Sequence, residues 1–178
     1  MTSRTLALAL LAATVVPAVA LAQHEPAHMS GAVDAVRPLY ERLRVLYIKS
    51  AELMPEADYS YRPTDKVRTF GEVLGHVANE NFLFCANAFG TENPNKADFE
   101  KVGKAAVLEG LKASFTYCDR AYRMDEAKAM EETTFFGDKG TRLWVLIYNA
   151  THDSEHYGNI VTYLRMKGLV PPSSQAGQ

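Results

Sequence analysis

Two histidines four residues apart give the strongest chemical signal in this 178-residue chain. His152 and His156 lie in the run 151–157, and the only other histidine beyond the N-terminal region is His76. In a helix, residues four apart lie on one face, one turn above the other. Two such imidazoles can bind one transition-metal ion, and a third from another helix would complete a three-nitrogen site. Three protein ligands leave positions for water or substrate, so the pattern predicts a catalytic metal site.

The neighbours of this pair are candidates for supporting roles. At about 100° per residue, Asn149 and Asn159 point close to the direction of the two histidines, and Glu155 lies to one side. Glu155 and Asn149 are the candidate catalytic residues, because they could orient an imidazole or contact a bound water. His76 lies beside apolar Val73, where an isolated buried imidazole would need a hydrogen-bond partner. Ordinary surface or core roles for the three histidines remain open at this point.

Other metal chemistries fit the same residues less well. The run from His152 to His156 also spells H-x-x-E-H, in which Glu155 would act as general base on zinc-bound water. The mixed α/β scaffold of such peptidases is not visible in the sequence. A di-iron bundle needs two Glu-x-x-His units, and the chain offers only Asp153-x-x-His156. Covalent haem is excluded because no Cys-x-x-Cys-His occurs.

Residues 1–22 have the pattern of a signal peptide. Arg4 supplies a basic start, residues 6–20 are mostly apolar, and residues 20–22 match a small-x-small cleavage site. We expect cleavage before Gln23, export to the periplasm or medium of a bacterium, and no stable membrane insertion afterwards. An uncleaved anchor is the rival, but the stretch is short for a span of about 20 residues.

The rest of the chain suits one domain with a small-molecule ligand or substrate. The formal charge of −2 becomes about −3 when Arg4 leaves with the leader (−2 − 1 = −3), and no basic stripe predicts a nucleic-acid partner. We expect a flexible lead-in over 23–31, a helical domain over 32–170 and a flexible tail over 171–178. A homodimer remains open.

Apolar residues at helical spacing predict four long helices, over roughly 32–53, 69–90, 100–124 and 141–167. Four amphipathic helices in one domain indicate an all-α four-helix bundle. Pro38 lies in the first helix, which should begin near it or kink there. Residues 125–139 are expected to form a short helical turn and then a loop, and no run of residues predicts a strand.

The helix ends and the two cysteines add further detail. Thr69 and Glu72 fit a capping box, and Gly90 fits a C-cap. Export permits a disulfide between Cys85 and Cys118. Until the order of the helices is known, two buried free thiols fit equally well.

Three stretches of the chain resemble the DinB-like superfamily, of the DinB and YfiT type. They are residues 54–63, residues 68–77, and residues 152–158 leading to 168–172. The resemblance covers nearly all of the mature chain. It implies an up-down-down-up bundle with a long crossover between the second and third helices. It also implies a divalent ion, most often Zn²⁺ or Ni²⁺, bound by His76, His152 and His156.

The resemblance also frames the expected function. Some members of this family are transferases or isomerases that use low-molecular-weight thiols, and others are described as hydrolases. An exported member would meet little thiol cofactor. We therefore expect a metal-dependent hydrolase or thiol-type transferase of unknown substrate. A non-catalytic metal or small-molecule binding protein is the alternative, and a structural bundle with a vestigial site is a third reading.

The same resemblance bears on the cysteines. In an up-down-down-up bundle the second and third helices run parallel. Cys85 and Cys118 lie about 16 and about 18 residues into these helices, so at about 1.5 Å per residue their heights nearly match. The resemblance therefore implies a Cys85–Cys118 disulfide.

Overall fold

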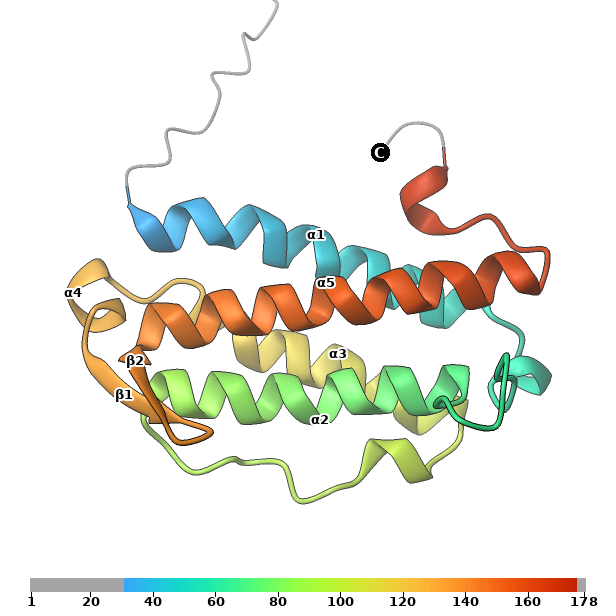
Figure 1. The fold of residues 1–178 in the computed structure, drawn as a ribbon, viewed down its shortest axis with the longest axis horizontal. Coiled ribbons are helices and arrows are strands. Elements are labelled where there is room, and N and C mark those ends of the chain that lie inside the picture. Colours follow the sequence, from blue (N-terminus) through green and yellow to red (C-terminus); the bar gives the residue numbers. More distant parts are fainter. Residues whose placement is uncertain (1–30, 176–178) are drawn as a thin grey trace, which may run out of the picture.

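The computed structural model describes residues 31–175, and helices make up most of that part of the chain (Figure 1). The expected signal peptide and residues 23–30 of the lead-in lie outside it. The elements follow in chain order: α1 (Ala32–Leu53), η1 (Glu56–Asp58), α2 (Phe70–Phe89), η2 (Phe99–Lys101), α3 (Lys104–Ala121), α4 (Glu126–Ala129), β1 (Glu132–Phe135), β2 (Asp138–Thr141), α5 (Arg142–Met166) and η3 (Pro172–Ser174).

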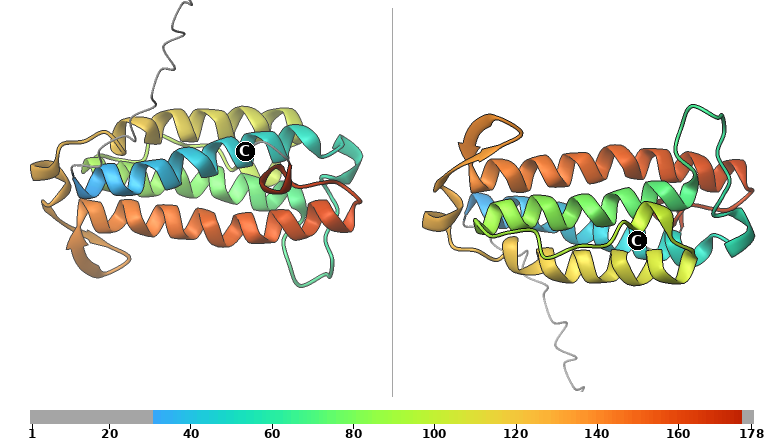
Figure 2. Two further views of the ribbon diagram at one scale, coloured as in Figure 1. Left: turned by 90° about the horizontal axis from the view of Figure 1, so that it is seen from above. Right: turned by 90° about the horizontal axis from the view of Figure 1, so that it is seen from below.

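The four long helices form an up-down-down-up bundle, which confirms the predicted fold. Helices α1 and α5 run in one direction, and α2 and α3 run in the other (Figures 1 and 2). Residues 91–103 therefore pass back along the bundle to connect the parallel helices α2 and α3. Helix α2 packs against both α3 and α5, and α1 packs against α5 and α3.

Local sequence signals set most helix boundaries. The capping box at the start of α2 is complete: the Glu72 amide donates to Thr69 Oγ1 at 3.2 Å, and the Thr69 amide donates to Glu72 Oε2 at 2.7 Å. Gly90 ends α2 with a φ of 73°, a left-handed conformation that glycine adopts without steric cost. Helix α1 begins at Ala32 and continues through Pro38.

The third helix begins later than predicted. It begins at Lys104, after the separate turn η2, where the Asp98 side chain accepts a hydrogen bond from the Glu100 amide at 3.2 Å. That side-chain bond caps a short 3-10 turn in place of a continuous helix from residue 100.

A β-hairpin lies where no strand was predicted. Strands β1 and β2 pair antiparallel, from Glu132 opposite Thr141 to Phe135 opposite Asp138. The two-residue turn has positive φ at both positions, 49° at Phe136 and 89° at Gly137, as a type I′ turn requires. The expected loop at 136–138 is therefore the tip of this hairpin.

Part of the expected tail is folded. Turn η3 packs against α1, Pro172 is buried, and the Ser173 amide donates to Tyr157 Oη at 3.2 Å. The flexible tail expected from residue 171 therefore has a defined place up to residue 175. Residues 176–178 lie outside the described part.

The core contains aromatic residues and one disulfide. Buried tyrosines satisfy their hydroxyls on main-chain oxygens, as with Tyr47 to Asp153 at 2.7 Å and Tyr122 to Leu146 at 2.8 Å. Cys85 and Cys118 are fully buried and joined in a disulfide, with Cα atoms 5.4 Å apart, as the parallel arrangement of α2 and α3 implied. No helix within residues 31–175 is both long and apolar enough to cross a bilayer.

Candidate metal centre

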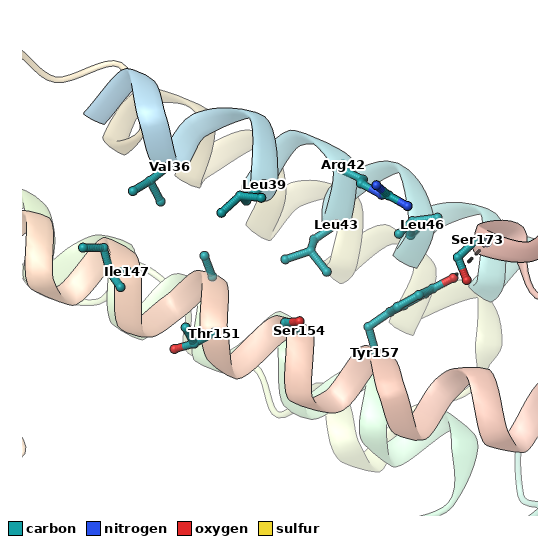
Figure 3. Close-up of a pocket in the computed structure, with 11 residues that line it drawn as sticks. Val36, Leu39, Arg42, Leu43, Leu46, Ile147, Thr151, Ser154, Tyr157 and Ser173 are labelled. Carbon is teal, nitrogen blue, oxygen red and sulfur yellow. Dashed lines mark hydrogen bonds between the residues drawn. The ribbon is translucent and has the colours of Figure 1, made fainter. Parts of the chain in front are cut away.

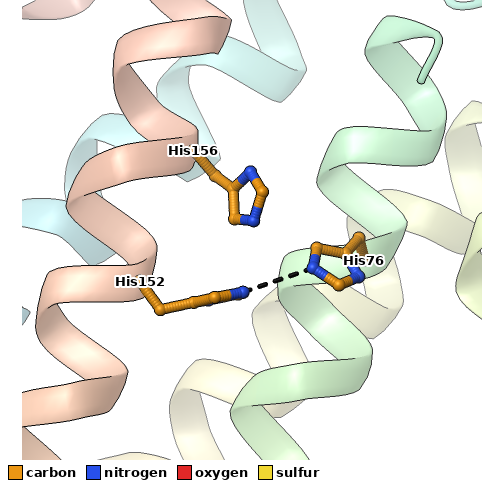
Figure 4. A group of neighbouring side chains, drawn as sticks. All are labelled: His76, His152 and His156. Atoms are coloured by element: carbon orange, nitrogen blue, oxygen red, sulfur yellow. Dashed lines mark hydrogen bonds between the residues drawn. The ribbon is translucent and has the colours of Figure 1, made fainter. Parts of the chain in front are cut away.

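The structure brings the three predicted histidines together. His76 comes from α2, and His152 and His156 come from successive turns of α5 (Figure 4). One nitrogen from each ring lies within 4.8 Å of the others, and the Nε2 atoms of His76 and His152 are 3.2 Å apart. The convergence follows from the packing of α2 against α5, because i, i+4 residues on α5 share the face that meets α2.

The electrostatics of this cluster favour neutral imidazoles. Burial lowers the pKa of His76, and the nearby Arg68 guanidinium lowers it further. Burial lowers the pKa of His156 to about 4, with smaller contributions from the other two histidines. A histidine must be neutral to bind a metal, so these two rings are ready ligands at neutral pH.

The donor set fits a divalent transition-metal ion. Nδ1 of His152 and Nδ1 of His156 are buried without a hydrogen-bond partner among residues 31–175. No protein atom in that range therefore fixes the tautomer of either ring, and the fit to a metal rests on the converging nitrogens. Three convergent imidazoles form the nitrogen-rich set that divalent transition metals accept, with fewer than the four protein ligands of a structural zinc site.

Glu100 orients His76, a role the sequence did not reveal. Nδ1 of His76 lies 3.2 Å from Glu100 Oε1, and Arg68 Nε donates to Glu100 Oε2 at 2.9 Å. A carboxylate at Nδ1 favours the tautomer that donates from this atom, which leaves Nε2 with a free lone pair toward the other histidines.

Two glycines allow Glu100 to reach this position. A Cβ on Gly75 would clash with the main chain of Phe99, and a Cβ on Gly110 would clash with the Phe99 ring. The crossover segment therefore lies directly on α2, one residue before His76, while the Phe99 ring packs on α3. This double contact places the next residue, Glu100, beside the His76 ring.

Asp153 is a second carboxylate beside the histidine cluster, next to His152. Its carboxylate is fully buried, and neither oxygen has a hydrogen-bond partner among the described residues. Oδ1 lies 3.5 Å from His152 Nδ1, which is too long for a strong hydrogen bond. Burial raises the pKa of Asp153 to about 6, and the adjacent His152 opposes part of that rise.

The two predicted catalytic residues lie in different surroundings. Glu155 is exposed and makes no hydrogen bond or ion pair within residues 31–175, so its role stays a prediction. Asn149 is fully buried, where its amide donates to Asn81 Oδ1 at 2.7 Å and accepts from Tyr122 Oη at 2.9 Å. The structure places Asn149 in this core network because both ends of its amide are engaged there.

Aromatic side chains cover the His152 side of the cluster. The Phe84 ring centroid lies 5.2 Å from that of His152 and 5.0 Å from that of Phe135. Tyr148 lies 5.5 Å from Phe84, and Phe136 at the hairpin tip lies 6.3 Å from it. The unpredicted hairpin thus packs on Phe84, the ring that contacts His152.

Two pockets differ in their relation to this centre. A pocket of about 420 Å³ lies between α1 and α5, and its lining is mainly apolar (Figure 3). None of the three histidines lines it, and Ser154, which lies between two of them in sequence, faces this other side of α5. A more polar pocket of about 450 Å³ is lined by His156 and lies directly beside the cluster.

Comparison with known proteins bears on the family of this chain. Residues 39–160, more than half of the chain, match the family model of the DinB superfamily. No curated protein matches the chain.

Solved structures share the fold at low sequence identity. A DinB-like protein from Bacillus cereus ATCC 10987 is 15% identical, with a TM-score of 0.68 over 78% of this chain and 95% of the other. YfiT from Bacillus subtilis, described as a probable metal-dependent hydrolase with an unusual four-helix bundle topology, is 15% identical, with a TM-score of 0.59 over 77% and 88%. A mycothiol-dependent maleylpyruvate isomerase is 16% identical, with a TM-score of 0.61 over 72% of this chain and 60% of the isomerase.

The length of the family match and the shared bundle lead to one conclusion: this chain belongs to the DinB superfamily.

Proposed function

We propose that this protein is a metal-dependent enzyme, a hydrolase in the first place, that acts on a small molecule. Its divalent ion, zinc or nickel, would be held by His76, His152 and His156. The observation that carries the proposal is the convergence of three imidazole nitrogens from two helices within 4.8 Å. The similarity to YfiT, itself described as a probable metal-dependent hydrolase, supports it.

The surrounding residues prepare the site for such chemistry. A bound divalent ion supplies Lewis acidity, which polarises a substrate carbonyl or phosphoryl group and makes a water molecule more acidic. Glu100 holds the His76 ring so that Nε2 faces the other two rings. Burial keeps His76 and His156 unprotonated, and the aromatic cover around Phe84 limits water on the His152 side.

A thiol-dependent transferase or isomerase is the second candidate. The similarity to a mycothiol-dependent isomerase favours it, although this chain spans only 60% of that protein. In both candidate functions the three histidines would hold the ion, so only the substrates that the protein turns over can distinguish the two functions.

Activity with and without metal tests the proposal. The purified protein is treated with a chelator, reloaded with Zn²⁺ or Ni²⁺, and assayed on ester, amide and phosphoester panels and on thiol-transfer panels. We expect turnover in one of the hydrolytic panels, loss of that turnover on chelation, and recovery on reloading. Turnover only with added thiol would select the second candidate. A metal-loaded protein without turnover in any panel would indicate a non-catalytic binding protein and overturn the enzyme assignment.

We also propose that the protein is exported after cleavage before Gln23. The buried Cys85–Cys118 disulfide supports this, because such bonds persist in oxidising compartments and are rare in the cytosol. Mass spectrometry of the protein recovered from cell fractions tests it. A chain that starts at Gln23 outside the inner membrane is expected, and an intact N-terminus on a cytosolic protein with two free thiols would contradict it.

A further inference from the structure

The pocket beside His156 has a one-sided charge. It lies between the loop before α2, the first turns of α2 and the C-terminal half of α5. Its lining contains two cations, several hydroxyl and amide groups and no carboxylate: Pro63, Thr64, Lys66, Val67, Arg68, Val73, His156, Asn159, Thr162 and Tyr163. A pocket of this composition attracts anions and repels cations.

Both cations have hydrogen-bonding capacity to spare. Lys66 Nζ has no ion pair or hydrogen-bond partner within residues 31–175. Arg68 uses Nε for Glu100, at 2.9 Å, and its two terminal nitrogens have no partner in that range. An arginine with both terminal nitrogens available matches the two oxygens of a carboxylate or phosphate, and a lysine adds a point charge.

The loop that carries the two cations is held in place. Tyr163 Oη donates to the Arg68 carbonyl at 2.6 Å, and the amides of Phe70 and Gly71 donate to the carbonyls of Tyr61 and Tyr59, each at 2.9 Å. These bonds tie the loop to α5 and to the turn around η1. The main chain that carries the two cations is therefore in place before a ligand arrives, which reduces the entropy lost on binding.

The pocket and the histidine cluster are one helical turn apart. Val73 lines the pocket three residues before His76, and Asn159 lines it three residues after His156. Because α2 and α5 run antiparallel, both offsets lead toward the same end of the bundle, by about 5 Å along the axis. A small molecule with one end in the pocket can therefore reach the histidines with the other.

We infer that this pocket binds an anionic group of the substrate, a carboxylate or a phosphate, between Lys66 and Arg68. Held there, the anion would place the bond to be cleaved beside the histidine cluster. The assignment of this ligand as a substrate rests on the proposed function, whereas anion binding itself does not require the metal.

Three probes and a matched pair of variants test the inference. Benzoate and phenylphosphonate are titrated calorimetrically against benzamide, a neutral analogue, in zinc-loaded and in chelator-treated protein. Lys66→Gln removes a cation that does not contact the cluster. Arg62→Gln is the control, because Arg62 lies in the same loop, is exposed like Lys66, and does not line the pocket.

The expected result is selective loss of anion affinity. Lys66→Gln should lower the affinity for the tighter-binding anion about tenfold, because a charged hydrogen bond is lost. Metal content and benzamide binding should stay unchanged. Arg62→Gln should match the wild type. Binding should persist, though weaker, after chelation, and the tighter probe identifies the class of anion.

Other results would overturn the inference. One is equal affinity for benzamide and benzoate. Another is equal anion affinity in the Lys66→Gln and Arg62→Gln variants. A third is anion binding that vanishes on chelation and is unchanged by Lys66→Gln. The last result would show that the anion binds the metal directly. A protein that binds no metal but shows the Lys66-dependent affinity would refute the proposed function and keep the anion site.

Discussion

Glu100 is the residue outside the histidines whose removal should affect metal binding most cleanly. Its carboxylate lies 3.2 Å from His76 Nδ1 and fixes the ring that faces the cluster. Glu100→Gln keeps the shape but weakens this interaction, so we expect metal affinity to fall about 10- to 100-fold. Competition with a chromophoric chelator measures the change.

Glu109→Gln is the matched control for Glu100→Gln. Glu109 lies on the exposed face of α3 and makes no hydrogen bond or ion pair within residues 31–175. The Glu109→Gln variant should bind metal with the affinity of the wild type. Equal affinities for the Glu100 and Glu109 variants would show that Glu100 does not orient the ligand.

Asp153 should lower the stability of the metal-free protein at neutral pH. Burial raises its pKa from 3.8 to about 6, so the folded state binds more protons than the unfolded state between these values. The unfolding free energy of the wild type therefore falls as the pH rises from about 4 to about 6 through this group. Asp153→Asn should gain about 1–3 kcal/mol at pH 7, and this gain should vanish below about pH 4.

Urea denaturation of both metal-free proteins at pH 4 and pH 7 measures this difference. The low-pH comparison is an internal control, because the wild-type carboxyl is protonated there. A pH-independent gap between the two proteins would contradict the assignment. The variant should also bind metal more weakly, since the carboxylate next to His152 Nδ1 is lost.

At this scale the sequence predicted the three clustered histidines better than the residues that contact them. The i, i+4 spacing of His152 and His156 is a local signal, and His76 stood out in an apolar stretch. Glu100 lies 24 residues from His76 in a connecting segment, so no local pattern relates the two residues. Asn149 was expected at the site from its helical angle, but hydrogen bonds with Asn81 and Tyr122 hold it in the core.

At the scale of the elements, the position of the crossover segment depends on the missing side chain of Gly75. A Cβ there would clash with the main chain of Phe99 and displace η2, which carries Glu100. We expect Gly75→Ala to lower stability by about 1–3 kcal/mol through overpacking, and metal affinity about tenfold through the loss of Glu100.

Gly158→Ala is the control for this prediction. Gly158 is exposed on α5, and a Cβ there would meet nothing within 4 Å. That change should be neutral or stabilising by up to about 1 kcal/mol, because alanine favours a helix. Thermal melts and metal titrations on both variants make the comparison. Unchanged metal affinity in Gly75→Ala would show that the position of the crossover segment does not affect metal binding.

The Cys85–Cys118 disulfide joins the parallel helices α2 and α3 over a sequence separation of 33 residues. In the chain-entropy model, a loop of this length contributes about 3–4 kcal/mol. Replacing both cysteines by alanine should therefore lower the melting temperature by about 10 °C, with metal binding retained. Calorimetry of the two proteins checks this, and two titratable thiols in the denatured, unreduced wild type would argue against the bond.

The elements were predictable where their signals were local. The capping box at Thr69 and the left-handed Gly90 marked both ends of α2. The hairpin was missed because its strands have only four residues, and its type I′ turn is formed by Phe136 and Gly137 in place of the usual Asn-Gly pair.

At the scale of the whole molecule, helical periodicity predicted the bundle but not the direction of its helices. The up-down-down-up order came from the family resemblance, because the expected loop over residues 91–99 does not reveal that the chain returns along the bundle there. That order places α2 between α3 and α5. From this central position, α2 contributes His76 to the histidine cluster with α5 and Cys85 to the disulfide with α3.

The metal content of the purified protein tests the central claim most directly. Mass spectrometry of the wild type and of His152→Ala, with circular dichroism as a check on folding, gives the ratio of metal to chain. We predict a stoichiometric zinc or nickel content in the wild type and almost none in a folded His152→Ala variant. Equal metal content in the two proteins would contradict a centre built from His76, His152 and His156.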